Sequence, residues 1–160
     1  MSVRNKVDKI LEVLIITIMT ILVLDVLWQV ASRYLLKTPS SFTDELAGFL
    51  LIWVGLFGAA YGTGKGLHLA IDLLPSKLPP DKKKYLDLTI HCLVGLFALT
   101  VMIVGGIWLV YTRFYLGQIS AALQLPLGYV YLVLPLSGLF IIYYSAHNSY
   151  LAFKPTDNQS

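Results

Sequence analysis

Four apolar stretches of about twenty residues each constrain the fold of this chain more than any other feature. They cover residues 10–31, 46–62, 86–111 and 127–146. A helix of about 20 apolar residues crosses the roughly 30 Å hydrocarbon core of a bilayer, and only helices or closed barrels satisfy their backbone polar groups there. The stretches are too long and too uniformly apolar to be barrel strands. We therefore predict an all-α integral membrane protein with four transmembrane helices.

The composition fits this class. The chain is 57% hydrophobic and 13% charged, and little of its 160 residues remains outside the spans, so we expect one membrane domain over residues 1–160. Arg4, Lys6 and Lys9 precede the first stretch, as they would in a cleaved signal peptide. That stretch is longer than a typical signal core and no clear small-x-small cleavage site follows it. A membrane span is therefore the favoured interpretation.

The positions of the basic residues predict the orientation, because positively charged loops are retained in the cytoplasm. Three of the 12 Lys and Arg residues fall on one side of the predicted membrane: Arg33, Lys37 and Arg113. The other nine fall on the opposite side, which holds both termini and the segment between the second and third spans. We therefore expect both termini in the cytoplasm. The net charge of +3 follows from this topology and requires no nucleic-acid partner.

The segment between the second and third spans, residues 63–85, mixes leucines with charges and contains three prolines. It is too short and too interrupted to span, so we expect short amphipathic helices along the cytoplasmic interface. His68 and Asp72 are four residues apart, but two ligands do not make a metal site, and capping or interfacial packing is the favoured role. A run of lysines should lie near anionic lipid headgroups: Lys82, Lys83 and Lys84.

The second span carries small residues at helical spacing. They are Gly48, Gly55, Gly58, Ala59, Gly62 and Gly66. Small residues let another helix approach closely, and close backbone contact drives helix association in lipid. The spacing does not say whether the neighbour belongs to this chain or to a partner, and a flexible, moving helix is the alternative. In the fourth span, Pro135 predicts a bend.

Polar residues inside or beside the spans are the main functional candidates. Asp25, Gln29 and Arg33 share one face of the first helix at successive four-residue steps, and Asp44 and Glu45 stand just before the second span. An ion pathway is one interpretation, and a structural network that joins the first two helices is the other. We favour the network, because the third and fourth spans supply almost no polar groups to continue a pathway.

Constellations for catalysis or metal binding are missing from the sequence. It contains no nucleophile with a base, no phosphate-binding glycine loop and no zinc spacing, so we expect neither enzyme activity nor a cofactor. Two alternatives remain open. His91 and His147 lie near the cytoplasmic ends of two spans and would suit a haem-binding or quinone-binding anchor of a respiratory enzyme. Asp25 would instead suit a small four-helix transporter that acts alone.

Several short motifs follow one another in a characteristic order. They are residues 29–34 (Gln-Val-Ala-Ser-Arg-Tyr), residues 44–47 (Asp-Glu-Leu-Ala), Trp53, residues 58–60 (Gly-Ala-Ala), Lys65, His68, Asp72, residues 125–129 (Leu-Pro-Leu-Gly-Tyr), Tyr131 and Pro135. Together they resemble the small membrane subunit (DctQ type) of tripartite ATP-independent periplasmic (TRAP) transporters, over essentially the whole chain. Two residues depart from the family pattern. Phe42 replaces a frequent tryptophan, and Lys65 replaces a common arginine whose bidentate fork lysine cannot form.

This resemblance implies a stationary scaffold subunit in the bacterial inner membrane. Its expected partners are a large elevator-type membrane subunit (DctM type), a periplasmic substrate-binding protein (DctP type) and membrane lipids. Transport would be driven by sodium, and the substrate would be an organic acid of the C4-dicarboxylate or sialic acid class.

The resemblance also implies roles for particular residues. Arg33 and Glu45, with Asp44, would join the first two helices or meet a partner near the periplasmic surface. His68 and Asp72 would order the start of the cytoplasmic segment. A third group would pack against another helix: Trp53, Gly55, Gly58 and Gly62.

Overall fold

The computed structural model describes residues 3–37, 40–66 and 80–153. The amphipathic helices predicted between the second and third spans, with His68 and Asp72, lie outside the described residues. Lys82, Lys83 and Lys84 fall in the first turns of a helix, and only their backbone is described.

The first two spans are single helices. Helix α1 is Val3–Tyr34 and helix α2 is Ser41–Lys65. Both extend beyond the predicted apolar stretches, because charged side chains at their ends, such as Arg4 and Lys65, can reach the headgroup region while the backbone continues as a helix. Ser40 caps α2 by accepting a hydrogen bond from the Thr43 N–H, and Gly66 ends it with a left-handed φ of 69°.

The third and fourth spans are each built from more than one helical segment. The third consists of α4 (Pro80–Phe97), a π-helix η2 (Ala98–Gly105) and α5 (Gly106–Tyr115). The fourth consists of α6 (Leu127–Tyr131) and α7 (Val133–Phe153). The interruption at Leu132 lies one turn before Pro135, whose missing N–H cannot bond the Tyr131 carbonyl.

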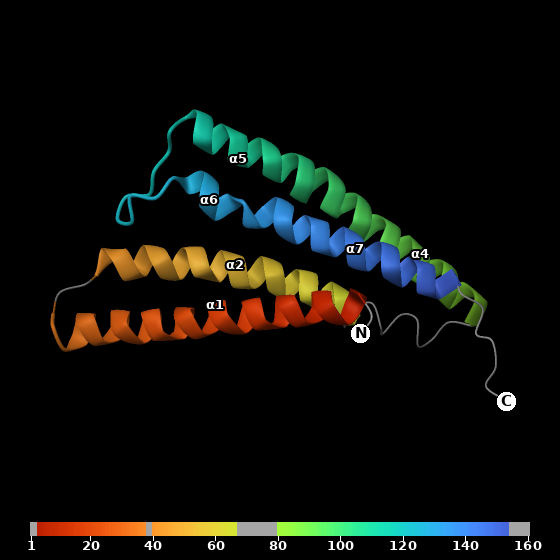
Figure 1. The fold of residues 1–160 in the computed structure, drawn as a ribbon, viewed down its shortest axis with the longest axis horizontal. Coiled ribbons are helices and arrows are strands. Elements are labelled where there is room, and N and C mark those ends of the chain that lie inside the picture. Colours follow the sequence, from red (N-terminus) through yellow and green to blue (C-terminus); the bar gives the residue numbers. More distant parts are fainter. Residues whose placement is uncertain (1–2, 38–39, 67–79, 154–160) are drawn as a thin grey trace.

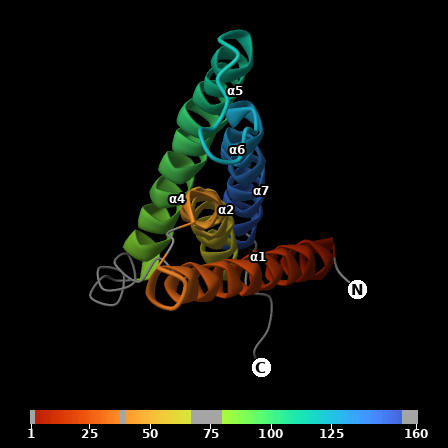
Figure 2. The same ribbon diagram turned by 90° about the vertical axis from the view of Figure 1, so that its left-hand side faces the viewer.

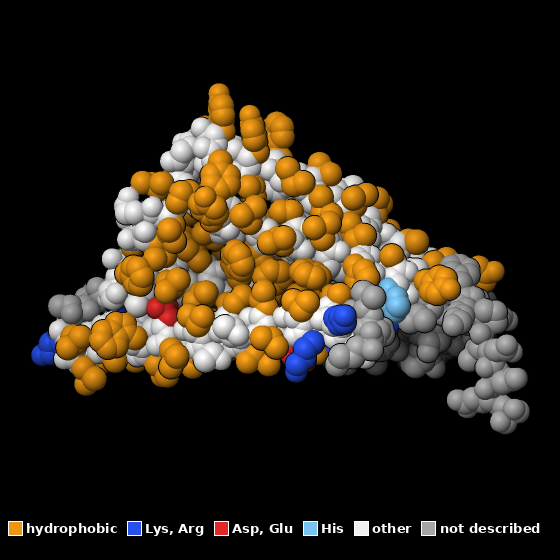
Figure 3. Space-filling view, in the orientation of Figure 1, with side chains coloured by type: hydrophobic (Ala, Val, Ile, Leu, Met, Phe, Trp, Pro, Cys, Tyr) orange, Lys and Arg blue, Asp and Glu red, His pale blue; other side chains and the backbone are white. Residues whose placement is uncertain are grey.

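The prediction of four membrane-spanning helices is confirmed. The helices that are long and apolar enough to cross a bilayer are Arg4–Tyr34, Ser41–Lys65, Tyr85–Tyr115 and Leu127–Tyr150. They form an open row, in which α1 packs against α2, α2 against α7, and α7 against α4 and η2 (Figure 1). Figure 2 shows α2 between α1 and the remaining helices. Apolar side chains cover most of the face drawn in Figure 3, as expected where lipid replaces water.

Two small clusters form the interior of this row. Leu11, Phe57, Val133 and Tyr144 join α1, α2 and α7. Ala60, Ala98, Met102 and Ile141 join α2, η2 and α7. Both α2 and α7 contribute to both clusters, so these two helices form the centre of the packing.

Glycines make the closest helix contacts within the chain, and they are not the ones that the sequence pattern singled out. A Cβ atom at Gly64 would lie 2.6 Å from the Tyr144 ring, and one at Gly106 would lie 3.0 Å from Pro135. A Cβ atom at Gly138 would lie 3.0 Å from Met102. Substituting these glycines would push neighbouring helices apart.

Candidate functional site

A polar tie joins α1 and α2 at the end of the row where α2 begins. The Gln29 amide donates a 2.6 Å hydrogen bond from Nε2 to Oδ1 of Asp44. Arg33 lies one turn further along α1. It lines a polar cavity of about 260 Å³ together with Gln29, Ser40, Ser41 and Asp44. The predicted cluster of Gln29, Arg33 and Asp44 is therefore brought together around one cavity.

Glu45 points to a different part of the molecule. Its carboxylate accepts backbone hydrogen bonds from Ala121 at 3.2 Å, Ala122 at 2.8 Å and Leu123 at 2.9 Å. It therefore anchors the segment between α5 and α6 to the first turn of α2. Among the residues that the structure describes, no carboxylate lies within ion-pair distance of Arg33. Sequence reasoning missed the Glu45 contact because main-chain donors about 77 residues away leave no side-chain pattern.

Asp25 lies one turn inside Gln29 on the same helix. Its side chain is half-buried, and its Oδ2 atom is buried without a hydrogen-bond partner in the described part of the chain. Asp25 is thus not part of the Gln29–Asp44 tie.

Trp53 connects α2 to the interruption in the fourth span. Its indole N–H donates a 3.0 Å hydrogen bond to the carbonyl of Val130 in α6, and its ring packs edge-on against Phe57 with centroids 5.7 Å apart. Since Val130 lies just before the interruption at Leu132, the indole satisfies a carbonyl at a point where the helix is broken.

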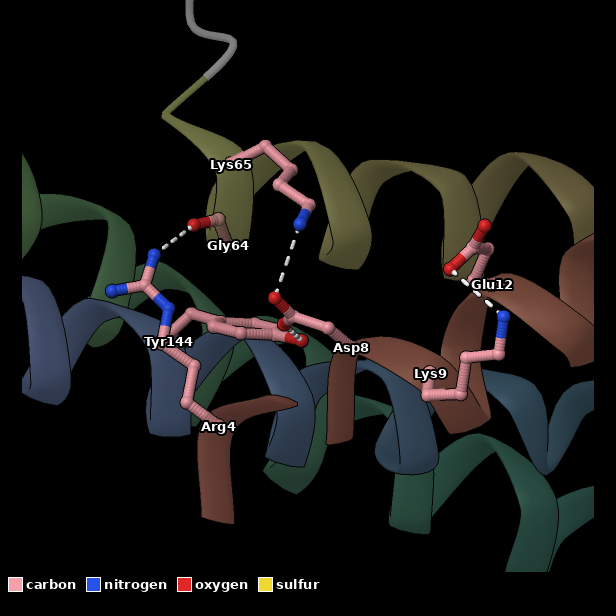
Figure 4. Close-up of polar contacts among 7 residues, drawn as sticks. All are labelled: Arg4, Asp8, Lys9, Glu12, Gly64, Lys65 and Tyr144. Carbon is pink, nitrogen blue, oxygen red and sulfur yellow. Dashed lines mark hydrogen bonds and ion pairs between the residues drawn. The ribbon is translucent and has the colours of Figure 1, made fainter. Parts of the chain in front are cut away.

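A second polar cluster joins three helices at the opposite end of the row (Figure 4). One carboxylate oxygen of Asp8 accepts a 2.5 Å hydrogen bond from the Tyr144 hydroxyl. The other forms an ion pair with Lys65 at 3.1 Å. Arg4 donates at 2.8 Å to the carbonyl of Gly64 near the end of α2. Residues on α1, α2 and α7 are therefore held together by one carboxylate and one guanidinium.

This second cluster was not identified from the sequence. Asp8 and Tyr144 are 136 residues apart, so no short-range spacing links them. The sequence offered only the three-residue spacing that places Asp8 and Leu11 on one helix face, and the structure shows that this face is turned inward at Leu11.

The predicted glycine face of α2 is open. A Cβ atom built at Gly48, Gly55, Gly58 or Gly62 would meet no heavy atom within 4 Å. Phe57, Ala60 and Gly64, which are among the residues of α2 buried within the chain, lie on other faces of the helix. The chain thus packs through one side of α2 and leaves the glycine side unfilled.

Two apolar grooves border α2. One of about 790 Å³ runs between α1 and α2, and Phe49, Leu50 and Trp53 line it on the α2 side. Another of about 420 Å³ lies between α2, α4 and α7 and includes Gly62 and Met102. Either could accept an apolar chain or helix.

The histidines do not form a metal cluster. Within residues 3–37, 40–66 and 80–153, no group of three or more His, Cys, Asp and Glu residues could hold a metal ion. The His147 ring stacks on Tyr143 with centroids 6.2 Å apart. The assembled features are instead ties between helices, two grooves and an open glycine face.

These four apolar helices, joined by polar ties at both ends, define a multi-pass membrane protein. Residues 11–154 match the family described as tripartite ATP-independent periplasmic transporters, DctQ component. The chain therefore belongs to the DctQ family of TRAP transporter small permease proteins, and it is a multi-pass inner-membrane component of a transporter rather than an enzyme.

Individual relatives agree with this assignment. A TRAP transporter small permease protein of Haemophilus influenzae is 25% identical over 140 residues, covering 88% of this chain and 85% of the relative. The C4-dicarboxylate TRAP transporter small permease protein DctQ of Rhodobacter capsulatus is 30% identical over 61% of this chain and 42% of its own length. The sialic acid TRAP transporter small permease protein SiaQ of Vibrio cholerae is 31% identical over 62% of this chain and 58% of its own length.

Proposed function

We propose that this chain is the stationary scaffold subunit of a sodium-driven TRAP transporter. It holds a large, elevator-type membrane subunit in place while that subunit moves an organic acid received from a periplasmic binding protein. Both termini and the segment between α2 and α4 lie in the cytoplasm, so the Asp44 end of the row faces the periplasm.

The open glycine face of α2 carries this proposal. Gly48, Gly55, Gly58 and Gly62 meet nothing within the chain, whereas Gly64 packs closely on Tyr144. In lipid, helices associate through close backbone contact, which glycines permit. Larger apolar side chains would make more van der Waals contact with lipid than glycines do, so a glycine face suits another helix better than lipid. A helix of the large subunit is the partner that this face fits.

A groove beside this face could accept side chains of a partner helix. It lies between α2, α4 and α7, and Gly62 and Met102 line it. A partner helix on the glycine face would place side chains in this groove and bury apolar surface that otherwise meets lipid.

A fourth relative supports a large permease as the neighbour. A sialic acid TRAP transporter permease protein SiaT of Haemophilus influenzae is 30% identical over 66 residues, which are 41% of this chain but 11% of that relative. A segment similar to this chain thus occurs within a much longer permease, as expected if the two parts lie against each other.

The polar cavity around Arg33 is the second part of the proposal. Arg33 is exposed and has no ion-pair partner among the described residues, and the cavity beside it opens at the periplasmic end. A carboxylate on the periplasmic binding protein would complement the guanidinium. C4-dicarboxylates and sialic acid, which appear in the names of relatives, are the candidate substrates.

The test compares two glycine-to-leucine variants of the same helix bundle. Gly58→Leu should leave the isolated subunit stable, because nothing lies within 4 Å of its Cβ position, and yet remove the large subunit from pull-downs and abolish transport. Gly138→Leu should instead destabilise the subunit itself, because its Cβ would press on Met102. Normal complex yield and transport by Gly58→Leu would overturn the proposal.

A further inference from the structure

The segment between α5 and α6, residues 116–126, lies beside the first turns of α2 and not beyond their end (Figure 1). Glu45, about one turn into α2, bonds the loop at Ala122, and Trp53, about three turns into α2, bonds Val130 in α6. At about 1.5 Å per residue, these levels are about 6 Å and about 18 Å along α2 from its first residue. The loop therefore lies level with the first turns of α2, and the fourth span begins beside α2 and not beyond its end.

The loop carries no charged side chain. Between Asp87 and Lys154, Arg113 is the only charged residue of the sequence. Its guanidinium turns inward, donating to the Gln118 amide and lying 5.3 Å from the Tyr131 ring centroid. Three large apolar side chains of the loop are exposed, Leu116, Ile119 and Leu125, and Gln124 is its one exposed polar side chain apart from the half-buried Gln118.

Many backbone polar groups of the loop have hydrogen-bond partners within the protein. Glu45 takes three of its N–H groups, and Ser120 donates to the Leu125 carbonyl at 2.8 Å. Leu127 donates to the Gln118 carbonyl at 2.9 Å, and Leu125 to the Ser120 hydroxyl. Non-helical backbone can lie at membrane depth only when such groups have partners.

Exposed aromatic side chains flank the loop at the same level. Tyr115 at the end of α5 is 77% exposed, and Tyr129 in α6 is 57% exposed. Tyr111 stacks on Tyr115 with centroids 6.0 Å apart and is exposed as well. Tyrosine rings favour the headgroup level of a bilayer, where one end of the ring is apolar and the other is wet.

We propose that residues 116–126 lie in the interfacial layer of the outer leaflet and bind phospholipid there, instead of forming a loop in water. The interfacial layer on each side of a bilayer is about 5–8 Å thick, since the core is about 30 Å and the whole about 40–45 Å. The position about 6 Å along α2 matches this layer. Lipid contact at this loop would fix the depth of the third and fourth spans, which bear on α2 through Glu45 and Trp53.

The experiment measures collision of nitroxide spin labels with oxygen, which partitions into lipid, and with a water-soluble nickel chelate. The single cysteine, Cys92, is replaced by serine, and labels are placed at Ile119 and at Leu125 in the full chain reconstituted in phospholipid vesicles. Two controls calibrate the scale. Val104 is an exposed apolar residue within the third span, and Lys37 is an exposed residue between α1 and α2.

The proposal predicts an oxygen-to-nickel ratio at both loop positions that lies on the Val104 side of the midpoint between the two controls. A ratio equal to that of Lys37 would show a loop in water and overturn the proposal. Low collision with both reagents would mean that protein covers the loop, and would also overturn it. Using two loop positions guards against a local effect of either label.

Discussion

Replacing Tyr144 by phenylalanine removes one hydroxyl from the most buried part of the molecule and isolates a single interaction. The Tyr144 side chain is fully buried, and its hydroxyl donates at 2.5 Å to Asp8, whose other oxygen pairs with Lys65. The ring itself, which packs on Gly64, is kept in the variant. The change in stability therefore reports the hydrogen bond between α7 and α1.

The expected magnitude follows from the nature of the acceptor. A hydrogen bond to a charged group contributes about 1.5–3 kcal/mol, and the Lys65–Asp8 pair, with 42% of the lysine side chain exposed, adds about 0–1 kcal/mol at most. We expect Tyr144→Phe to lower the free energy of unfolding by about 2 kcal/mol, and the melting temperature by about 4–8 °C for a chain of this length.

The assay is thermal unfolding of the purified subunit in mild detergent, with Tyr143→Phe as the matched control. Tyr143 is the adjacent residue, and its hydroxyl makes no hydrogen bond in the described part of the chain. The control should therefore shift the melting temperature little. In an Asp8→Ala background, Tyr144→Phe should have almost no further effect. Equal shifts for the two tyrosine variants would refute the reasoning.

Three further predictions concern the other end of the row. Glu45→Gln should release the backbone of residues 121–123, seen as faster amide hydrogen exchange there, and unchanged protection would contradict the role of the carboxylate. Trp53→Phe should cost about 1 kcal/mol of unfolding free energy by leaving the Val130 carbonyl without its donor, and an unshifted melting temperature would count against that bond. Arg33→Ala should leave the complex intact and slow transport that depends on the periplasmic binding protein, whereas an unchanged rate would leave Arg33 without a function in docking.

The four spans could be predicted from the sequence because the bilayer imposes one simple requirement, a long apolar helix, that composition alone reveals. The interruption near Pro135 has an equally local cause, since proline lacks the N–H that a helix needs. The proximity of Gln29 to Asp44 also follows from short-range information, because a brief connection holds the two helix ends together.

The remaining contacts depend on how the helices are ordered in space, which periodicity does not encode. The row α1, α2, α7, α4 brings Asp8 to Tyr144 and Glu45 to the main chain at Ala122. Small-residue spacing in α2 identified a packing face but could not say that the chain leaves it open. The glycines that do pack within the chain, such as Gly106 against Pro135, occur singly and have no repeating pattern.

The order of the helices also explains why the open face matters for function. A closed four-helix bundle would satisfy its own packing, whereas in this row α2 packs on α1 and α7 and leaves its glycine side open. The buried interior joins α2 to α1 through Leu11 and to α7 through Tyr144. The glycine side of α2 is thus presented by a helix that is itself firmly held.

Affinity purification of this chain from its native membrane in mild detergent, with the co-purifying proteins identified by mass spectrometry, tests the scaffold role most directly. The account predicts recovery with a much larger polytopic membrane protein in stoichiometric amount, and loss of that protein from the Gly58→Leu variant. Recovery of the chain alone, together with transport by the chain reconstituted by itself, would contradict it.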